Sequence, residues 1–458
     1  MSNRTNAAPE RGHTLCIIEK RAAQKRKRSK GVVVAKVGEQ INFDPAILDT
    51  FDVKGWQPLH YDLLLVSAAV EFADRRWKRP RGWSRRMDVT VPVIELGVWQ
   101  RKDVQSSLEA VLRHLTGDTW RFSFVQSKDK SPIGSRQAAL PFKKTKTFAI
   151  AYSDGLDSRA ASALSGDKEK ALCIRVAGTR NRRKKGEDYF TQIPFKVEGH
   201  GSRESSFRTR GFQFSALTAI AAHLSNVSRI VVPESGQGAL GPVLLPLHTI
   251  YADYRNYPTF FRRMERFVNV LLGCKVRYEQ PRLWQTKGQT LRAFLELPGK
   301  SKENLTSSRS CWQTRRVVNV GSRKQCGLCA ACLLRRLSMH AAGIDEAPDT
   351  YVVANLGAAA VSEALSVIPQ EADRKLMIEY GSVGARHLQQ LADMARLSDG
   401  DLRRYAAEIA EAMGVTEKDT LKHLRTLLVA HDSEWQKFLA AQGEKSFLKN
   451  WLEGGRHG

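Results

Sequence analysis

The sequence predicts an α/β protein built on a parallel sheet, with an α+β segment before this core and a helical segment after it. Over residues 141–345 the pattern runs strand, glycine-containing turn, helix, strand, which is typical of a parallel sheet. Residues 31–140 combine an apolar helix with short strands, and residues 346–458 show amphipathic helical periodicity. Together with residues 1–30, these ranges predict four parts in a chain of 458 residues.

Residues 1–30 are expected to be a flexible basic arm. Seven Lys and Arg residues lie between Lys20 and Lys30, with few apolar residues to order them. Two interpretations stay open for this arm, contact with nucleic acid or a partner, and a purely solubilising role.

The α+β segment contains one predicted buried helix and two predicted strands. Residues 61–72 are apolar enough for the helix, whereas residues 89–93 and 120–124 alternate as strands and are rich in β-branched or aromatic side chains. Between the strands, Asp103 is expected to cap a further helix that ends near Leu115.

Charge and composition restrict the class of protein. The net charge of +26 indicates a phosphate-bearing or acidic partner, or else a basic solvated surface, and nucleic acid is one possible partner. No apolar run is long enough to span a membrane, and the N-terminus lacks the apolar stretch of a secretory signal. Hydrophobic residues make up 42% of the chain, so we expect a globular protein. The lack of a predicted span or signal, together with the cysteine usage described below, predicts a cytoplasmic location.

A candidate nucleotide site follows the first strand of the predicted parallel sheet. Residues 147–152 form this strand, residues 153–158 read Ser-Asp-Gly-Leu-Asp-Ser, and residues 159–164 open a helix. A short polar loop at a helix N-terminus attracts anions, because backbone N–H groups point outward and the helix dipole adds to the attraction. Asp157 is expected to hold Mg²⁺ or to fix the loop. The candidate binding residues are Ser153, Asp154, Gly155, Leu156, Asp157 and Ser158.

Four of the seven cysteines have the spacing of metal ligands. Fourteen residues separate Cys311 from Cys326, and Cys329 and Cys332 follow with two residues in each gap. Four thiolates at this spacing predict a closed, tetrahedral, structural zinc site. An iron–sulfur cluster and free cysteines are the alternatives. The cysteine usage fits a reducing compartment rather than a disulfide framework.

The loop at 153–158 resembles the PP-loop motif Ser-Gly-Gly-x-Asp-Ser, whose enzymes cleave ATP between the α and β phosphates. Asp154 stands where that family has glycine, so a degenerate, inactive loop stays open as an alternative. The loop lacks the Gly-Lys-Ser/Thr ending of a Walker A motif. The resemblance implies an adenine nucleotide alpha hydrolase-like core.

The loop and the cysteines together resemble the QueC family of 7-cyano-7-deazaguanine synthases. The family signature Cys-Gly-x-Cys-x-x-Cys-x-x-Arg is matched by residues 326–335. Lys287 falls in a Thr-Lys element similar to the family's, and Arg210 begins a segment similar to its Arg-Asn-x-x-Phe helix start. Tyr257 and Pro258 match a substrate-binding Tyr-Pro loop, although Thr259 replaces the acidic residue that usually follows.

The resemblance covers roughly residues 145–345, and the flanking segments are similar to larger QueC-like proteins of bacterial anti-phage defence systems, as in Qat and type IV CBASS. It implies ATP-dependent adenylation of 7-carboxy-7-deazaguanine and transfer of the acyl group to an amine, such as the N-terminus of a partner protein. The implied cofactors are ATP, Zn²⁺ and Mg²⁺, and a homodimer is possible.

On this resemblance, Lys287, Arg210 and a Mg²⁺ ion are the expected positive charges for the leaving pyrophosphate, and Asp157 is a further catalytic candidate that would hold the ion or fix the loop. Three alternatives stay open: a nitrile-forming synthase with fused domains, a tRNA-modifying PP-loop enzyme and a non-catalytic adaptor. A basic segment after the second strand is expected to guide an acidic partner or nucleic acid, or to be a solvated loop; its residues are Arg180, Arg182, Arg183, Lys184 and Lys185.

Overall fold

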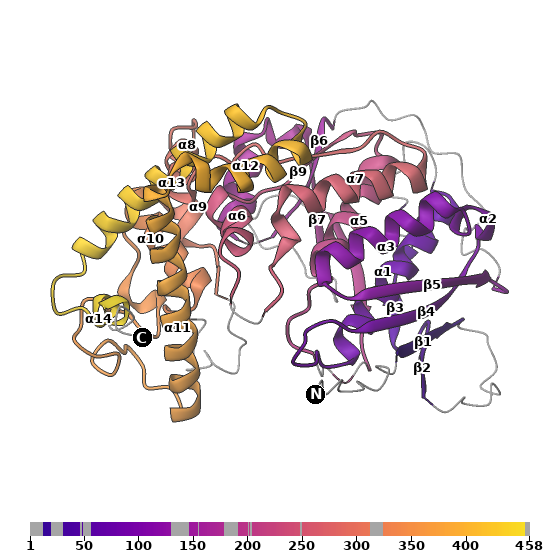
Figure 1. Cartoon of the computed structure of the whole chain (residues 1–458), viewed down its shortest axis with the longest axis horizontal. Coiled ribbons are helices and arrows are strands. Elements are labelled where there is room, and N and C mark those ends of the chain that lie inside the picture. Colours follow the sequence, from indigo (N-terminus) through magenta and orange to yellow (C-terminus); the bar gives the residue numbers. More distant parts are fainter. Residues whose placement is uncertain are drawn as a thin grey trace, which may run out of the picture. The chain divides into compact units, whose positions relative to one another are not determined.

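The computed structural model describes most of the chain as two compact units, of which the first has mixed α/β structure (Figure 1). The described residues are 12–19, 31–45, 48, 56–129, 146–153, 155–177, 191–199, 201, 204–247, 250–311 and 324–453. The first unit comprises Met1–Tyr152, Asp167–Val232 and Pro246–Glu279, and the second comprises Ser153–Gly166, Pro233–Leu245 and Gln280–Gly458. Both units therefore draw on residues 141–345, which the sequence pattern had grouped together.

The first unit contains a four-stranded sheet with the strand order β2-β1-β4-β5. Its strands are β1 (His13–Ile18), β2 (Val32–Lys36), β4 (Arg86–Val93) and β5 (Thr119–Gln126). All three pairings in this sheet are parallel. The expected α+β arrangement is therefore wrong here, because helices α2 (Leu96–Trp99) and α3 (Lys102–Thr116) carry the chain back between β4 and β5.

Strand β1 also corrects the expectation of a flexible arm over residues 1–30. Residues His13–Ile18 pair with two neighbouring strands, and Leu15 and Ile17 are buried in the core of this unit. The short apolar run from Leu15 to Ile18 was the available signal, and the neighbouring basic run from Lys20 to Lys30 outweighed it in the interpretation. Residues 1–11 and 20–30 lie outside the described part.

The expected helices of this region are present, with one corrected cap. Helix α1 (Pro58–Arg76) is buried along most of its length and extends beyond the predicted range 61–72. Helix α3 begins after Arg101, so Asp103 lies in the first turn rather than at the cap, where its carboxylate pairs with Arg101 at 2.6 Å. Gly117 ends α3 in the left-handed conformation, with φ of 72°.

A second sheet of the first unit has six strands in the order β10-β9-β6-β7-β8-β3. Its strands are β6 (Phe148–Ala151), β7 (Ala171–Ala177), β8 (Thr191–Val197), β9 (Arg229–Val231), β10 (Arg277–Glu279) and β3 (Ile41–Phe43). The first five are parallel to one another, and β3 is antiparallel to β8. Counted along the chain from β6, the parallel strands lie in the order 5-4-1-2-3, so the winding reverses beside β6.

Two helices of the first unit pack near this sheet. Helix α5 (Arg210–Leu224) is apolar on nearly all sides and contacts β6, β7 and β9, whereas α7 (Pro258–Leu272) is amphipathic and packs on α3 and α5. The apolar side chains of both sheets and these helices form one continuous core.

The second unit is mainly helical, as expected for the C-terminal part of the chain. Its helices are α4 (Leu156–Leu164), α6 (Gly236–Leu244), α8 (Lys287–Leu295), α9 (Lys302–Thr306), α10 (Ala330–Ala341), α11 (Glu371–Asp393), α12 (Asp399–Met413), α13 (Glu417–Ala440) and α14 (Phe447–Glu453). Helices α11, α12 and α13 lie within residues 346–458, where the amphipathic periodicity predicted helices. None of the helices in the described ranges has the length and apolar character needed to cross a membrane.

Candidate functional site

The loop that follows β6 folds tightly onto the first turn of α4. Gly155 is the N-cap of α4, and its N–H donates to Ser153 Oγ at 3.2 Å. The hydroxyls of Ser153 and Ser158 lie 2.9 Å apart. Ser153 is exposed and Ser158 is buried, so the pair brings one solvent-accessible hydroxyl to the N-terminus of a nine-residue helix.

Packing against α8 sets the position of α4. Leu156 and Ala160 on α4 form a small buried cluster with Leu291 and Phe294 on α8. Leu156 is thus a core residue whose side chain is fully buried, and only its backbone is available to a ligand. This contact brings the first turns of the two helices together.

Lys287 is the first residue of α8, and its ammonium lies between two carboxylates. Lys287 Nζ is 2.7 Å from Asp157 Oδ2 and 3.8 Å from Glu234 Oε1. Burial of the ammonium lowers the pKa of Lys287, but the charges of Asp157 and Glu234 outweigh this effect and the pKa is raised. Lys287 is therefore a fixed positive charge at neutral pH.

The start of α8 is itself held by a capping box. Thr286 is the N-cap, its hydroxyl accepts from Gln289 N at 2.9 Å, and Gln289 Oε1 accepts from Thr286 N at 2.8 Å. The two reciprocal bonds fix the first turn from which the Lys287 side chain extends.

Sequence reasoning missed a second polar turn at this site. Glu234 and Ser235 lie in the short turn between β9 and α6, and Ser235 Oγ is 3.5 Å from Asp157 Oδ1. The signal was available, because Pro233-Glu234-Ser235-Gly236 is another short polar turn between a strand and a helix.

The remaining predicted residues of the nucleotide site are placed separately. Asp154 lies outside the described residues, as does the basic segment at 180–185. Arg210 is the exposed first residue of α5, with its guanidinium carbon 5.1 Å from the centroid of the Phe214 ring. Tyr257 is buried at the N-cap of α7, and Pro258 is the first residue of that helix. Arg210, Tyr257 and Pro258 belong to the first unit, whereas Lys287 and Asp157 belong to the second.

The four predicted cysteine ligands come together in the second unit. The sulfur atoms of Cys311, Cys326, Cys329 and Cys332 all lie within 4.8 Å of one another. Cys326 Sγ and Cys332 Sγ are 3.7 Å apart, close to the roughly 3.8 Å expected between two ligands of a tetrahedral zinc ion with Zn–S bonds of about 2.3 Å. The cluster therefore has the donor set and the size for a metal ion such as zinc.

Backbone N–H groups donate hydrogen bonds to two of the sulfur atoms, as they do in sites that hold thiolates. Cys326 N donates to Cys311 Sγ at 3.4 Å, and Cys329 N donates to Cys326 Sγ at 3.3 Å. Gly327 makes this turn with φ of +86°, and a Cβ at this position would lie 2.5 Å from Val353 O. Only glycine satisfies both requirements.

Arg335, the last residue of the family signature, anchors the segment that leads to Cys311. Its side chain is buried, pairs with Glu346 at 2.8 Å and donates to Ser308 Oγ at 2.8 Å. It also donates to the carbonyl of Thr306 at 3.2 Å. In the described structure, Arg335 thus has a structural rather than a ligand-binding environment.

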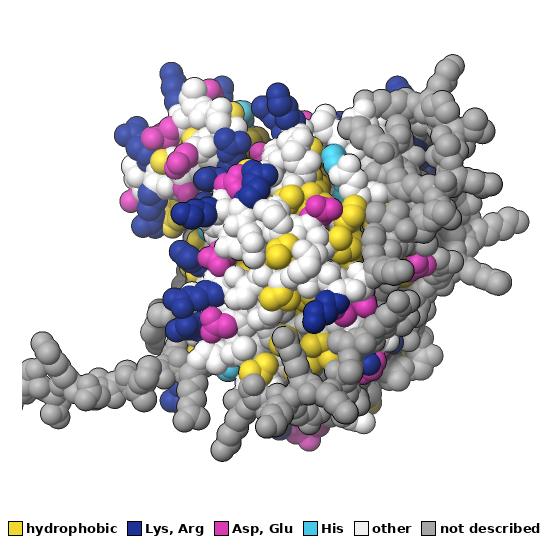
Figure 2. All heavy atoms as spheres, turned by 90° about the vertical axis from the view of Figure 1, so that its right-hand side faces the viewer, with side chains coloured by type: hydrophobic (Ala, Val, Ile, Leu, Met, Phe, Trp, Pro, Cys, Tyr) yellow, Lys and Arg dark blue, Asp and Glu magenta, His cyan; other side chains and the backbone are white. Residues whose placement is uncertain are grey.

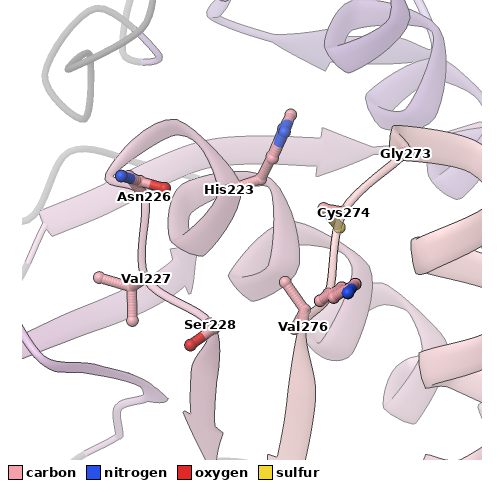
Figure 3. A pocket seen from close by; sticks show the side chains of 8 residues that line it. His223, Asn226, Val227, Ser228, Gly273, Cys274 and Val276 are labelled. Atoms are coloured by element: carbon pink, nitrogen blue, oxygen red, sulfur yellow. The ribbon is translucent and has the colours of Figure 1, made fainter.

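A separate hollow of about 230 Å³ lies in the first unit (Figure 3). His223 lines it from the end of α5, and Cys274 and Lys275 line it from the connection to β10. His223 Nδ1 is 2.9 Å from Nε2 of the buried His60. The hollow lies at the amino ends of β9 and β10, whereas ligands of parallel α/β sheets bind outside the carboxyl ends.

Among the described residues on the face shown in Figure 2, the basic side chains do not form one unbroken surface. Lys and Arg side chains there lie among Asp and Glu side chains and uncharged surface. A nucleic-acid partner therefore stays a prediction. Comparison with protein-family models and with curated proteins finds no match to this chain.

Proposed function

We propose that this chain is an ATP-dependent, adenylate-forming enzyme of the PP-loop class that activates a carboxylic acid and passes the acyl group to an amine. The observation that carries the proposal is the 2.7 Å contact between Lys287 Nζ and Asp157 Oδ2. This contact joins Lys287, the expected phosphate-binding cation, to the first turn of α4, which follows the polar loop. No local sequence pattern requires the two residues to meet.

The strand order supports this choice of ligand site. β6 leads into Ser153 and β9 leads into Glu234, and these two strands are the neighbours between which the winding of the sheet reverses. In open α/β sheets, ligands bind outside the carboxyl ends of the strands at such a reversal. Both polar turns thus begin where a nucleotide is expected.

The charge of the site fits a nucleotide with its metal. Asp157 and Glu234 carry two negative charges against the single positive charge of Lys287. Carboxylate oxygens are the ligands that Mg²⁺ prefers, so Asp157 and Glu234 are the side chains that would hold the ion beside the phosphates. The bound ion would supply neutralisation of charge on the departing pyrophosphate.

In the proposed reaction, a carboxylate oxygen of the substrate forms a bond to the α phosphorus of ATP. The bond from this phosphorus to the oxygen bridging to the β phosphate breaks, and pyrophosphate leaves with the electron pair. Lys287 and the Ser153 hydroxyl stabilise this negative charge as it develops. An amine then attacks the acyl carbon, AMP leaves, and the amide forms with loss of one proton to solvent.

The four-cysteine site has a structural role in this proposal. Four thiolates fill a tetrahedral zinc shell and leave no position for water, so the metal would stabilise the fold rather than take part in the reaction.

The identity of the substrate rests on the sequence resemblance alone. It points to 7-carboxy-7-deazaguanine as the acid and to a partner protein's N-terminus as the amine, in bacterial anti-phage defence. Tyr257 and Pro258 are the proposed substrate contacts, and Arg210 is a proposed cation for the leaving pyrophosphate. A nitrile-forming synthase and a tRNA-modifying PP-loop enzyme are the alternatives.

The test is to incubate the purified chain with ATP, Mg²⁺, 7-carboxy-7-deazaguanine and ammonium, and to identify the products by mass. AMP and pyrophosphate that appear only with the acid support adenylate formation. An adenylate or amide without nitrile then favours another amine as acceptor, whereas a nitrile identifies a synthase. No ATP turnover would support the adaptor alternative.

A further inference from the structure

One face of α13 contacts each segment that holds Lys287. His423, Leu427, His431 and Glu434 recur every three or four residues and therefore share one face of this helix. The segments they contact are the end of the connection into α8 and the start of α6. The neighbouring helices can be followed in Figure 1.

The strongest of these contacts is a buried hydrogen-bond chain that ends on the backbone of Lys287. Lys287 N donates to Gln237 Oε1 at 2.7 Å, so the Gln237 amide nitrogen must donate to His431 Nδ1, which lies at 2.9 Å. His431 Nε2 lies 2.9 Å from Leu388 O on α11, to which it donates as a neutral imidazole. Each donor and acceptor in the chain thus has one assigned partner.

Burial keeps His431 in this neutral form. Its side chain is fully buried, and burial lowers the pKa of His431 to about 4. His387 on α11 and Asp432 on α13 are the titratable neighbours that act on it. The orientation of Gln237 is therefore unchanged across neutral pH.

A second contact from α13 holds the cap of α8. Thr286 Oγ1 donates to Glu434 Oε1 at 2.8 Å. Thr286 Oγ1 also accepts the capping hydrogen bond from Gln289 N. A Cβ at Gly288 would lie 2.7 Å from Glu434 Oε1, so the backbone of α8 approaches this carboxylate closely.

Two further contacts of α13 complete the arrangement. The Trp284 ring stacks on His423 with the ring centroids 5.5 Å apart. A Cβ at Gly236 would overlap Leu427, and Gly236 N donates to Gln285 O at 2.9 Å. The turn before α6 and the turn before α8 are thus packed together under one helix.

We infer that α13 positions the ammonium of Lys287 for the reaction, with Gln237 and His431 as positioning residues. This inference rests on the proposed function and deepens it, because it makes the C-terminal helices part of the nucleotide site. The backbone of Lys287 has no freedom to shift along α8 while Gln237 and Glu434 hold it. A displacement of about 1 Å of a reacting or charge-stabilising group lowers turnover by as much as 100-fold.

The test compares His431→Phe, Gln237→Glu and the control Val429→Ala, which lies on the exposed side of the same helix. The readouts are kcat and KM for ATP in acid-dependent pyrophosphate release, and hydrogen exchange of the backbone amide of Lys287. His431→Phe removes both ring nitrogens and keeps a planar ring. Gln237→Glu keeps an oxygen that accepts from Lys287 N. Its second oxygen replaces the amide nitrogen and therefore faces His431 Nδ1, so that two hydrogen-bond acceptors meet.

His431→Phe is expected to lower kcat about 10- to 100-fold with little change in KM, and to speed exchange of the Lys287 amide. Gln237→Glu is expected to recover activity as the pH falls, because a protonated His431 can donate from Nδ1 to the introduced carboxylate. The wild type should not show this gain. If His431→Phe does not fold, the pH profile of kcat for the isosteric variant Gln237→Glu tests the inference instead.

Turnover of His431→Phe equal to that of Val429→Ala, with unchanged amide exchange, would overturn the inference. A different result would contradict the proposed function itself, namely that the wild type releases no pyrophosphate. In that case the exchange of the Lys287 amide in the two variants still decides whether α13 holds this residue.

Discussion

Lys287 Nζ lies 2.7 Å from Asp157 Oδ2, although the two residues are 130 positions apart in the sequence. Helix α4 carries Asp157, helix α8 carries Lys287, and the two helices meet through the buried side chains of Leu156 and Leu291. The ion pair thus depends on tertiary packing, and it brings a fixed cation to the N-terminus of the helix behind the polar loop.

The first prediction concerns this cation. Lys287→Ala should lower pyrophosphate release by about 100- to 1000-fold, the usual effect of removing one group that stabilises charge in the transition state. Lys287→Arg keeps the charge and should retain more activity. Circular dichroism and thermal melting check that both variants fold, and near-normal turnover of Lys287→Ala would remove this residue from the site.

The second prediction concerns the cysteine cluster. The purified protein should contain one zinc ion per chain by elemental analysis and should be colourless, whereas an iron–sulfur cluster would absorb visible light. Cys329→Ser should lower the melting temperature markedly, because the buried apolar residues around the cluster depend on the closed turn. Zinc-free protein with unchanged thermal stability would contradict a structural metal site.

The third prediction separates two effects of glycine near this cluster. Gly327 and Gly343 both have positive φ values, +86° and +66°, but only Gly327 has a neighbouring atom, Val353 O, within 4 Å of an added Cβ. Gly343→Ala should cost about 1 kcal/mol of unfolding free energy from conformation alone. Gly327→Ala should cost clearly more, measured by urea unfolding, and should also weaken zinc retention. Equal losses would mean that the contact with Val353 is readily relieved.

The fourth prediction concerns acid sensitivity of the first unit. Burial lowers the pKa of His114 to about 3, assisted by the charge of Arg263, and its Nε2 lies 2.7 Å from Thr259 Oγ1. As the pH falls below about 6.5, the unfolded chain binds a proton that the folded His114 does not, so stability falls.

Between pH 7 and pH 5 this one group should cost about 2 kcal/mol of unfolding free energy. His114→Gln should therefore show a shallower loss of stability over this range in urea titrations at each pH. If His114→Gln loses as much stability as the wild type between pH 7 and pH 5, groups other than His114 cause the acid sensitivity.

The parts that could be predicted from the sequence are those written in local patterns. The strands near Val89 and Phe122, the helix after Ser153 and the spacing of the four cysteines each depend on a few adjacent residues, and the structure contains them. Cys326, Cys329 and Cys332 are held together by a short turn and the start of α10, and Cys311 joins them from fourteen residues upstream, as the spacing predicted.

The parts that could not be predicted depend on contacts between distant segments. Parallel pairing of β1, β4 and β5 depends on how helices α1, α2 and α3 return the chain, which alternation alone does not reveal. The roles of Glu234, Gln237 and His431 likewise arise from packing of α6, α8 and α13, and His431 in isolation is indistinguishable from any core histidine.

The central claim is that the site around Lys287 and Asp157 cleaves ATP between the α and β phosphates. The most direct measurement is exchange of labelled pyrophosphate into ATP in the presence of Mg²⁺ and 7-carboxy-7-deazaguanine, with wild type, Lys287→Ala and the surface control Val429→Ala. We predict acid-dependent exchange by the wild type and the control, and little or none by Lys287→Ala. Formation of ADP and phosphate without exchange, or equal exchange by all three proteins, would contradict the claim.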